Sequence, residues 1–465
     1  LYLAAMVSTA AELALVDGGG RALLAPLRAR RAARLCFLAY LAWSALSALL
    51  SPYEGVWIGL GRYEGLLSIC LYVLVFLAVS SYGRPDSRLL YLLGAVVAVN
   101  AVIGTLQYAG WNPLWLFPEG TDYHDAFILY NGAFMGTLGN VDLLSAFLCL
   151  AVPVFYGAYL ATGRKLALVP MGLGGYLLAL ADVDSGYLGI LGALLLTIPF
   201  YYRTRRACWR GMVAVGTLLA ALGVGKLLYA DRDVSLCLRP GAVSVGAIVL
   251  GASAAALGAL LLRRQDQGRA AAAQPLWRPR WLWAALGGLA VVGVIAAYAI
   301  PFSSGPAYEL HQILHGNIDP SFGSGRIRIW QEVVRLIGEA PLFGGGPDTL
   351  VARMTFTFTR YSEEVGGTIE AVVDAAHNEC LNIAVNQGLP ALAAYLAGIA
   401  ICLRRAWQRR SKTAAVLLAG LVGHLMQGCF TINTCPVAAP FWISLALCER
   451  DQDINDQNDK EEQQT

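Results

Sequence analysis

Charged residues are scarce in this sequence. They make up 14% of the 465 residues, whereas a soluble globular protein carries about 25%. Hydrophobic residues make up 57% of the chain, and the mean hydropathy is +0.56. This composition excludes an ordinary soluble protein and indicates an integral membrane protein. The net charge of +3 argues nothing by itself, and we expect no nucleic-acid partner.

Metal and redox motifs are also missing. The ten cysteines contain no C-x-x-C spacing, so zinc knuckles and thioredoxin-type chemistry are unsupported. Cys429 and Cys435 are close in sequence near one expected membrane face, either as a disulfide or as two small packing residues. No A-x-A cleavage site leading into a soluble domain follows the apolar residues 1–16, so we expect no cleaved signal peptide. Because the chain begins at Leu1, we interpret it as a fragment or a trimmed sequence.

Long apolar segments recur along the chain. A membrane span needs about 20 predominantly apolar residues. The sequence therefore predicts an all-α, polytopic integral membrane protein with about 12–13 transmembrane helices. The candidate spans are 1–16, 34–51, 66–81, 89–110, 134–160, 165–181, 186–202, 211–229, 240–262, 281–302, 378–403, 413–431 and 436–448.

Lysine and arginine are distributed unevenly between the two sides of these spans. Counted along the sequence, 25 of the 34 basic residues lie in every second connection, beginning with 17–34. Cytoplasmic loops carry such an excess. The pattern predicts a multi-pass protein of the cell inner membrane with a cytoplasmic C-terminus.

This topology divides the chain into four regions. They are an N-terminal transmembrane bundle (1–302), a large extracytoplasmic loop (303–377), C-terminal transmembrane helices (378–448) and a cytoplasmic tail (449–465). The tail is polar and acidic from residue 451, DQDINDQNDKEEQQT, and such a composition predicts disorder.

The nine remaining cations face outward in this topology and are candidates for binding an anion. They are Arg62, Lys226, Arg232, Arg239, Arg326, Arg328, Arg335, Arg353 and Arg360. The densest group lies in a segment that predicts an amphipathic helix on the outer membrane surface, capped by Ser324. Its expected apolar face consists of Ile327, Trp330, Val334 and Ile337. Glu332 is in register with Arg328 and Arg335, and Arg335 with Glu339.

Arg326 has no obvious partner within that helix. It lies in the first turn, where free backbone N–H groups and the helix dipole favour an anion. Arginine at such a position suits a phosphate. The alternative is that the arginines bind anionic lipid headgroups or keep the helix hydrated, which we favour for Arg328 and Arg335.

A second polar cluster opens the stretch HNECLNIAVNQGLP at residues 377–390. His377 precedes a predicted helix, 378–403, whose positive end disfavours the imidazolium. A neutral imidazole can accept a proton from a hydroxyl. Asn378 and Asn382, together with Asn386, follow on one helix face and could hold the histidine or a substrate. The alternative is a capping histidine with amides that join helices.

Two further patterns suit a metal ion but have plainer explanations. His311 and His315 are four residues apart, as in some metal sites. Asp182-Val183-Asp184 and Asp231-Arg232-Asp233 resemble pairs that hold Mg²⁺ or Mn²⁺. We favour surface histidines and ordinary turns, and we expect neither a metal site nor a cofactor.

Four segments together resemble the O-antigen ligase and O-antigen polymerase family of bacterial membrane glycosyltransferases. They are GRYEGLL (61–67), GTLGNVDLLSAFL (136–148), SGRIRIW with PLFGGGPDTL (324–350), and HNECLNIAVNQGLP (377–390). They follow the family order, with the long loop before the penultimate helices, and the resemblance covers most of the chain from about residue 34.

The resemblance implies a reaction and a site. A glycan moves from an undecaprenyl-diphosphate carrier to an acceptor hydroxyl outside the membrane, without a metal. Carried over by motif, His377 is the catalytic base and Arg326 binds the donor diphosphate, with Arg328 and Arg62 assisting. The acceptor is a glycan, a lipid or a protein. The motifs do not separate ligation from polymerisation.

Two departures from the family pattern stand out. Many members carry an arginine in the exterior turn that here reads DVDSGYLG (182–189), so one phosphate contact must come from elsewhere, such as Arg62 or Arg232. The family's G-N-P-N is here Gly139-Asn140-Val141-Asp142, where Asp142 keeps a polar side chain.

Other classes of protein remain open. A flippase or transporter of a lipid-linked glycan predicts internal repeats and charges at mid-membrane. We find no clear repeat, and the charges gather at the exterior face. A protein O-oligosaccharyltransferase, a peptidoglycan polymerase and a non-catalytic scaffold are further alternatives. A scaffold would tolerate the loss of both His377 and Arg326.

Overall fold

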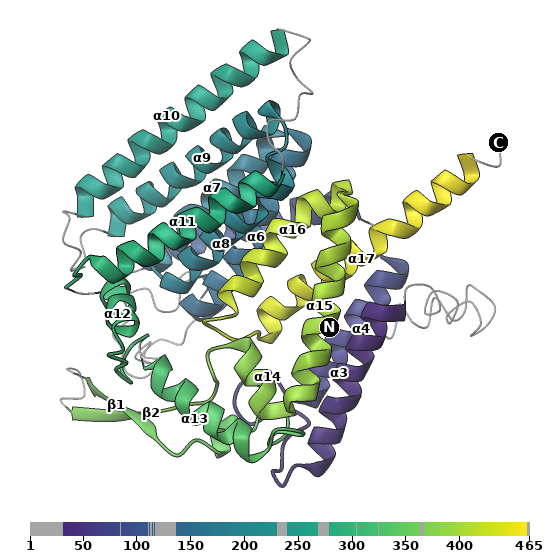
Figure 1. The fold of residues 1–465 in the computed structure, drawn as a ribbon, viewed down its shortest axis with the longest axis vertical. Coiled ribbons are helices and arrows are strands. Elements are labelled where there is room, and N and C mark those ends of the chain that lie inside the picture. Colours follow the sequence, from purple (N-terminus) through teal and green to yellow (C-terminus); the bar gives the residue numbers. More distant parts are fainter. Residues whose placement is uncertain are drawn as a thin grey trace.

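The computed structural model describes residues 31–462, except 84, 110, 112–113, 115, 117–135, 230–239, 268–278, 304, 324 and 363–366. This part of the chain is almost entirely helical (Figure 1), which confirms the all-α fold class. Its elements are α3 (Arg31–Leu50), α4 (Leu66–Tyr82), α5 (Ser87–Tyr108), α6 (Val141–Thr162), η3 (Lys165–Ala167), α7 (Leu168–Ala181), α8 (Asp184–Tyr201), α9 (Arg205–Tyr229), α10 (Pro240–Gln267), α11 (Pro279–Ala299), α12 (Gly305–Leu314), α13 (Arg326–Glu339), η4 (Leu350–Ala352), β1 (Thr357–Ser362), β2 (Gly367–Val372), α14 (Glu379–Gln387), α15 (Leu389–Arg409), α16 (Lys412–Gln427) and α17 (Cys435–Glu462).

The helices have the lengths and composition of membrane spans. Within the described residues, seven helices are long and apolar enough to cross a bilayer, and four further apolar helices are shorter. The chain is therefore a multi-pass membrane protein. Each span predicted after residue 34 coincides with a helix or with two consecutive helices. The span predicted at 1–16 lies outside the described residues.

Helix α6 forms the centre of the bundle. Every residue from Leu144 to Leu160 is buried, and α7, α8 and α16 pack around it. A helix that is apolar on all sides is expected to be buried in this way. Asn140 caps its N-terminus by accepting the N–H groups of Asp142 at 2.7 Å and Leu143 at 3.3 Å. The second family-like segment thus begins the central helix.

A second group of helices holds the N- and C-terminal parts of the described chain together. Helix α15 packs against α3, and α17 packs against α4. Trp442 lies at their centre, with its ring 4.9 Å from Phe37 and 6.2 Å from Phe76. Helices α9 and α10 lie at the opposite edge of the molecule (Figure 1).

The loop 303–377 folds as a small unit at one end of the bundle (Figure 1). It contains α12, α13 and an antiparallel hairpin in which Thr357 of β1 pairs with Val372 of β2. The hairpin was not predicted, although residues 357–372 are rich in Thr, Phe, Tyr, Ile and Val, which favour strands. It is a local exception to the helical fold.

Helix α13 buries a different face from the one predicted. Ile329, Val333 and Leu336 are buried, whereas Val334 is 57% exposed. The buried face packs within the loop, in a cluster that also contains Leu350, Val373, Ala376 and Val385. Of the predicted apolar face, Trp330 and Ile337 pack against this cluster and Val334 is exposed, because the loop has a small core of its own. The position of the helix on the membrane surface stays a prediction. The N-cap is Gly325 at φ +83°, and Ser324 lies outside the described residues.

The predicted helix 378–403 is divided in two. Gly388, at φ +89°, separates α14 from α15. A Cβ atom at this position would lie 2.0 Å from the carbonyl oxygen of Leu342, so the break requires glycine. The asparagines at 378, 382 and 386 consequently belong to a short helix that packs against the loop, and the candidate membrane span begins at Leu389.

The acidic tail also differs from its prediction. Helix α17 continues to Glu462, whereas composition predicts disorder over 449–465. Residues 441–462 contain neither glycine nor proline, so no residue in this stretch interrupts a helix that starts in the membrane.

Candidate functional site

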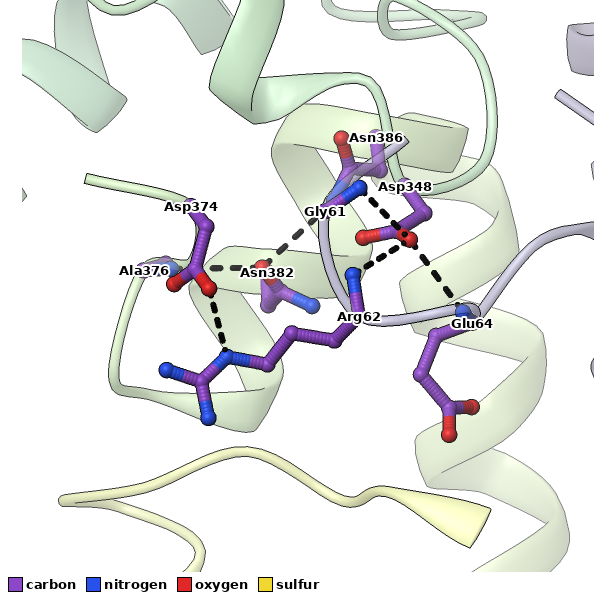
Figure 2. Close-up of polar contacts among 8 residues, drawn as sticks. All are labelled: Gly61, Arg62, Glu64, Asp348, Asp374, Ala376, Asn382 and Asn386. Carbon is purple, nitrogen blue, oxygen red and sulfur yellow. Dashed lines mark hydrogen bonds and ion pairs between the residues drawn. The ribbon is translucent and has the colours of Figure 1, made fainter. Parts of the chain in front are cut away.

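Asp348 joins two of the family-like segments. Its Oδ2 atom accepts the backbone N–H groups of Gly61 at 3.1 Å, Arg62 at 2.9 Å and Glu64 at 3.2 Å. Figure 2 shows the carboxylate enclosed by this turn. At Gly59, φ is +106° and a Cβ atom would lie 2.3 Å from the same oxygen. The GLGRYEG turn is thus shaped around a carboxylate that is almost 290 residues later in the chain.

The glycine run before Asp348 packs against α14. The N–H groups of Gly345 and Gly346 donate to the carbonyls of Val385 at 3.1 Å and Asn386 at 2.8 Å. Arg353 donates to the same two residues, at 2.9 Å to the Val385 carbonyl and 3.0 Å to Asn386 Oδ1. This exterior cation, one of the anion-binding candidates, therefore stabilises the contact between the loop and α14.

The segment before His377 is held from two sides. The indole of Trp330 on α13 donates to the carbonyl of Ala376 at 2.9 Å, and Asn382 Oδ1 accepts the N–H of Ala376 at 3.3 Å. His377 follows with φ +46°, a left-handed conformation that is uncommon for residues other than glycine. Such conformations persist where the surroundings over-determine them, and they cluster at functional sites.

The two supporting asparagines act on the backbone. Asn378 caps α14 by accepting the N–H of Leu381 at 3.0 Å, and it donates to the carbonyl of Cys429 at 2.9 Å. Asn382 accepts from Ala376 and from the amide of Asn386, the latter at 3.4 Å (Figure 2). These bonds tie the His377 turn to α14 and to the connection between α16 and α17.

The electrostatic surroundings of His377 bring three of the predicted site residues together. The ring is half-buried, and burial lowers its pKa below the ordinary value of 6.5. The positive charges of Arg326 and Arg62 lower the pKa further, whereas Asp142 and Asp374 oppose them. At neutral pH the imidazole is therefore uncharged and able to accept a proton.

Arg62 is oriented by a carboxylate. Its Nε atom lies 2.9 Å from Asp374 Oδ2, and the two side chains are 27% and 29% exposed. Figure 2 shows the rest of the guanidinium beyond this contact, pointing away from Asp348. Asp374 therefore holds one edge of the guanidinium and leaves its other N–H groups for a ligand.

Arg326 is arranged differently. Its Nη1 donates to the carbonyl of Gly323 at 3.1 Å, while its buried Nε atom has no hydrogen-bond partner among the described residues. The first-turn N–H groups are not free as expected, because residues 326, 327 and 328 donate to the carbonyls of Gly323, Phe322 and Pro320. The guanidinium and the helix dipole, rather than these amides, are what an anion would meet here.

Arg328 lies apart from this group. Its guanidinium stacks over the ring of Phe356, 4.1 Å from the centroid, and the residue is exposed. Arg335, rather than Arg328, forms the ion pair with Glu332, at 2.7 Å. Arg335 also pairs with Glu339, as predicted.

Several residues of the site escaped the sequence analysis. Asp348, Asp374 and Trp330 act only through partners that are distant in sequence. Glu379 follows the H-N pair and is half-buried beside the 428–435 connection, where its carboxylate accepts the N–H of Asn433 at 2.7 Å. Burial raises the pKa of its carboxyl to about 7. Of these residues, only Glu379 could have been found from the sequence, because it directly follows the H-N pair.

The patterns considered for metal binding have other contacts. The described residues contain no group of three or more His, Cys, Asp and Glu side chains suited to a metal ion. The rings of His311 and His315 are tilted relative to each other with centroids 4.2 Å apart, His315 stacks on Tyr298, and Asp182 pairs with Lys226. The second Asp-x-Asp lies outside the described residues. Cys429 and Cys435 are both free, so the disulfide alternative is wrong.

Comparison with known protein families gives a match over part of the chain. Residues 240–396 match the family described as O-Antigen ligase. The matched region runs from α10 into α15, and it includes Arg326, Arg328, His377, Asn378 and Asn382. No curated protein matches the chain. This match confirms that the chain resembles the O-antigen ligase family, as its four sequence segments predict.

Proposed function

We propose that this protein is a glycosyltransferase that moves a glycan from an undecaprenyl-diphosphate carrier to an acceptor hydroxyl. One observation carries the proposal: Arg62, Arg326 and His377 come from three separate segments, and both arginine charges act on the histidine. A neutral base beside two cations suits a reaction in which a hydroxyl loses a proton and a diphosphate departs.

In the proposed reaction the acceptor oxygen attacks the sugar carbon that bears the diphosphate. A new carbon–oxygen bond forms, the bond to the diphosphate oxygen breaks, and the acceptor proton passes to a ring nitrogen of His377. Arg326 and Arg62 balance the charge that develops on the leaving diphosphate. Preorganised cations at a low-dielectric membrane face are effective at this because they need no reorganisation. Direct displacement would invert the sugar carbon.

Asp374 and Trp330 position the reacting groups. Asp374 orients the Arg62 guanidinium, and Trp330 holds the backbone directly before His377. The proposed chemistry requires no metal ion, and we expect transfer to persist in the presence of EDTA. Arg328 is no longer part of the proposed donor site, because it stacks on Phe356 at the surface.

The membrane and the side of the reaction are part of the proposal. The excess of basic residues in alternate connections assigns 303–377 to the extracytoplasmic side of the cytoplasmic membrane. The acceptor would be a surface glycan or lipid, for ligation or polymerisation of a polysaccharide. A protein acceptor is the alternative within the same chemistry.

The test is glycan transfer in membranes that are supplied with a synthetic undecaprenyl-diphosphate glycan and a panel of acceptors. We expect the wild type to release undecaprenyl diphosphate. His377→Ala should lower the rate by about 10²–10⁴-fold, the usual contribution of a positioned base. His315→Ala, a histidine of the same loop that stacks on Tyr298, is the matched control and should retain activity.

Two results would contradict the proposal. Normal transfer by folded His377→Ala would remove the histidine from the mechanism. If the wild type transferred nothing to any acceptor but moved the labelled lipid between leaflets, a flippase would replace the enzyme.

A further inference from the structure

A cavity lined by the start of α5, the end of α6 and the start of α16 lies away from the proposed site. It has a volume of about 910 Å³, near the upper end of the roughly 300–1,000 Å³ typical of small-molecule sites. Its walls come from α5, α6, α7, α16 and α17. None of the residues discussed above as part of the glycan-transfer site lines it.

The deep part of the cavity is apolar and built from small side chains. Its lining includes Gly94, Ala95 and Ala98 of α5 and Ala158 and Ala161 of α6, together with larger apolar side chains such as Phe155 and Leu173. Small residues on facing helices usually permit close packing. Here α5 packs mainly against α7 and only weakly against α6, so these residues border a space. A space of this size beside lipid is suited to an acyl chain.

The mouth of the cavity is polar and carries two cations. Arg164, directly after α6, and Lys412, the first residue of α16, both line it and are exposed. In the part of the chain that the structure describes, neither makes an ion pair. The carboxylate at the mouth, Asp86, caps α5 through the N–H of Arg88 at 2.9 Å and pairs with the Arg88 side chain at 3.7 Å. A positive charge therefore remains at the entrance.

The depth of the cavity matches one leaflet. Its lining on α5 runs from Ser87 to Ala98, which is about 17 Å along a helix at about 1.5 Å per residue. Half of the bilayer hydrocarbon core is about 15 Å. Tyr91, which lines the cavity and is 56% exposed, is an aromatic residue of the type found at the membrane interface.

We propose that this cavity binds an anionic diacyl phospholipid of the cytoplasmic leaflet, with its phosphate at Arg164 and Lys412 and an acyl chain between α5 and α6. The assignment to this leaflet follows from the basic residues that place Arg164 and Lys412 on the cytoplasmic side. The proposal is independent of the glycan-transfer reaction, since the cavity is separate from His377.

Native mass spectrometry of the purified full chain tests this proposal. The detergent-solubilised protein is titrated with phosphatidylglycerol and with phosphatidylcholine of identical acyl chains. Each basic residue near a membrane surface contributes about 1 kcal/mol toward binding an anionic lipid, so we expect the wild type to prefer phosphatidylglycerol by about tenfold or more. The double variant Arg164→Gln/Lys412→Gln should lose this preference.

The matched control is Arg205→Gln/Arg404→Gln, which removes two exposed cations from the same predicted side but outside the cavity. This variant should bind both lipids as the wild type does. Ala95→Trp, at an exposed position on the lining, narrows the cavity and should lower binding of both lipids. If Ala95→Trp does not fold, replacement of Tyr91 with a photo-crosslinking phenylalanine analogue should label phosphatidylglycerol.

Three results would overturn the proposal. They are unchanged lipid binding in folded Ala95→Trp, a phosphatidylglycerol preference that survives loss of both cations, and displacement of phosphatidylglycerol by undecaprenyl phosphate at a lower concentration. The last would make the carrier lipid the occupant.

Discussion

The central helix α6 is buried and the segment 374–387 is buried or half-buried, but the two are held in place by different means. Helix α6 is enclosed by apolar side chains on every side. The segment around His377 is held by hydrogen bonds from side chains to backbone groups, from Trp330, Asn382 and Arg353. Apolar packing thus determines the structure of the bundle, whereas individual hydrogen bonds determine the structure of the candidate site. Substitutions that preserve volume but remove a partner should therefore damage the site far more than the bundle.

We expect the largest difference in glycan-transfer activity between variants of two neighbouring arginines, Arg326 and Arg328. We expect Arg326→Ala to lower glycan transfer by about 10²–10³-fold, the usual cost of losing a group that stabilises transition-state charge. Arg328→Ala should remain within about threefold of the wild type because it removes only an exposed contact with Phe356, of the order of 1 kcal/mol. Glycan-transfer rates of the two variants, measured at matched expression, test this prediction. Equal losses in both variants would mean that the helix surface, and not the Arg326 position, binds the donor.

A second comparison concerns carboxylates that accept backbone N–H groups. Asp348→Ala leaves three partly buried N–H groups of the Arg62 turn without their acceptor, at about 1–3 kcal/mol each where the group stays unpaired. We expect this turn to become sensitive to protease and transfer to fall at least tenfold. Asp86→Ala, which loses an exposed cap of α5, should cost about 1 kcal/mol. Similar protease patterns in the two variants would show that the turn does not depend on Asp348.

The buried carboxyl of Glu379 predicts how the stability of the site end depends on pH. Its pKa is raised to about 7 from 4.5, so the folded state binds the proton more tightly than the unfolded state. The stability from this group is fully present below pH 4.5 and is lost as the pH rises through about 7. Glu379→Gln, which cannot ionise, should lose less thermal stability between pH 5 and 8 than the wild type, as roughly one buried charge is avoided.

Thermal midpoints in detergent across this range measure the effect. Glu339→Gln is the control, because Glu339 is exposed and paired with Arg335. A wild type and a Glu379→Gln variant with the same pH dependence would show that Glu379 is already ionised in the folded protein.

The smallest effect should be a shift in the acid limb of the pH–rate profile. Arg62 is one of the charges that lower the pKa of His377, and its partner Asp374 acts in the opposite direction. Arg62→Gln removes the positive charge and leaves the carboxylate, so the pKa of His377 should rise toward 6.5. We expect kcat/KM to begin falling at a higher pH than in the wild type, by less than about one unit. Arg335→Gln is the control and should leave the acid limb of the kcat/KM profile unchanged. A shift of this limb to lower pH in Arg62→Gln would contradict His377 as the base.

Local patterns in the sequence predicted the helices and misplaced the details of the loop. Apolar length alone located the helices of the bundle, because a bilayer requires about 20 apolar residues whatever the partner helix. The face of α13 was misjudged because Val333 and Leu336 pack against Leu350 and Val373, which are contributed by later segments. The division of the helix at Gly388 depends on the carbonyl of Leu342, and no periodicity signals that approach.

The sequence by itself determined that the chain is an all-α multi-pass membrane protein, and it singled out His377 and Arg326. These features depend on composition, charge distribution and short motifs, all of which are local. Only the tertiary structure decided that the charges of Arg62 and Arg326 act on His377, that Arg328 stacks on Phe356, and that Asp348, Asp374 and Trp330 hold the arrangement. Those roles depend on hydrogen bonds and charges between residues that are tens to hundreds of positions apart, and such distances exist only after the chain has folded.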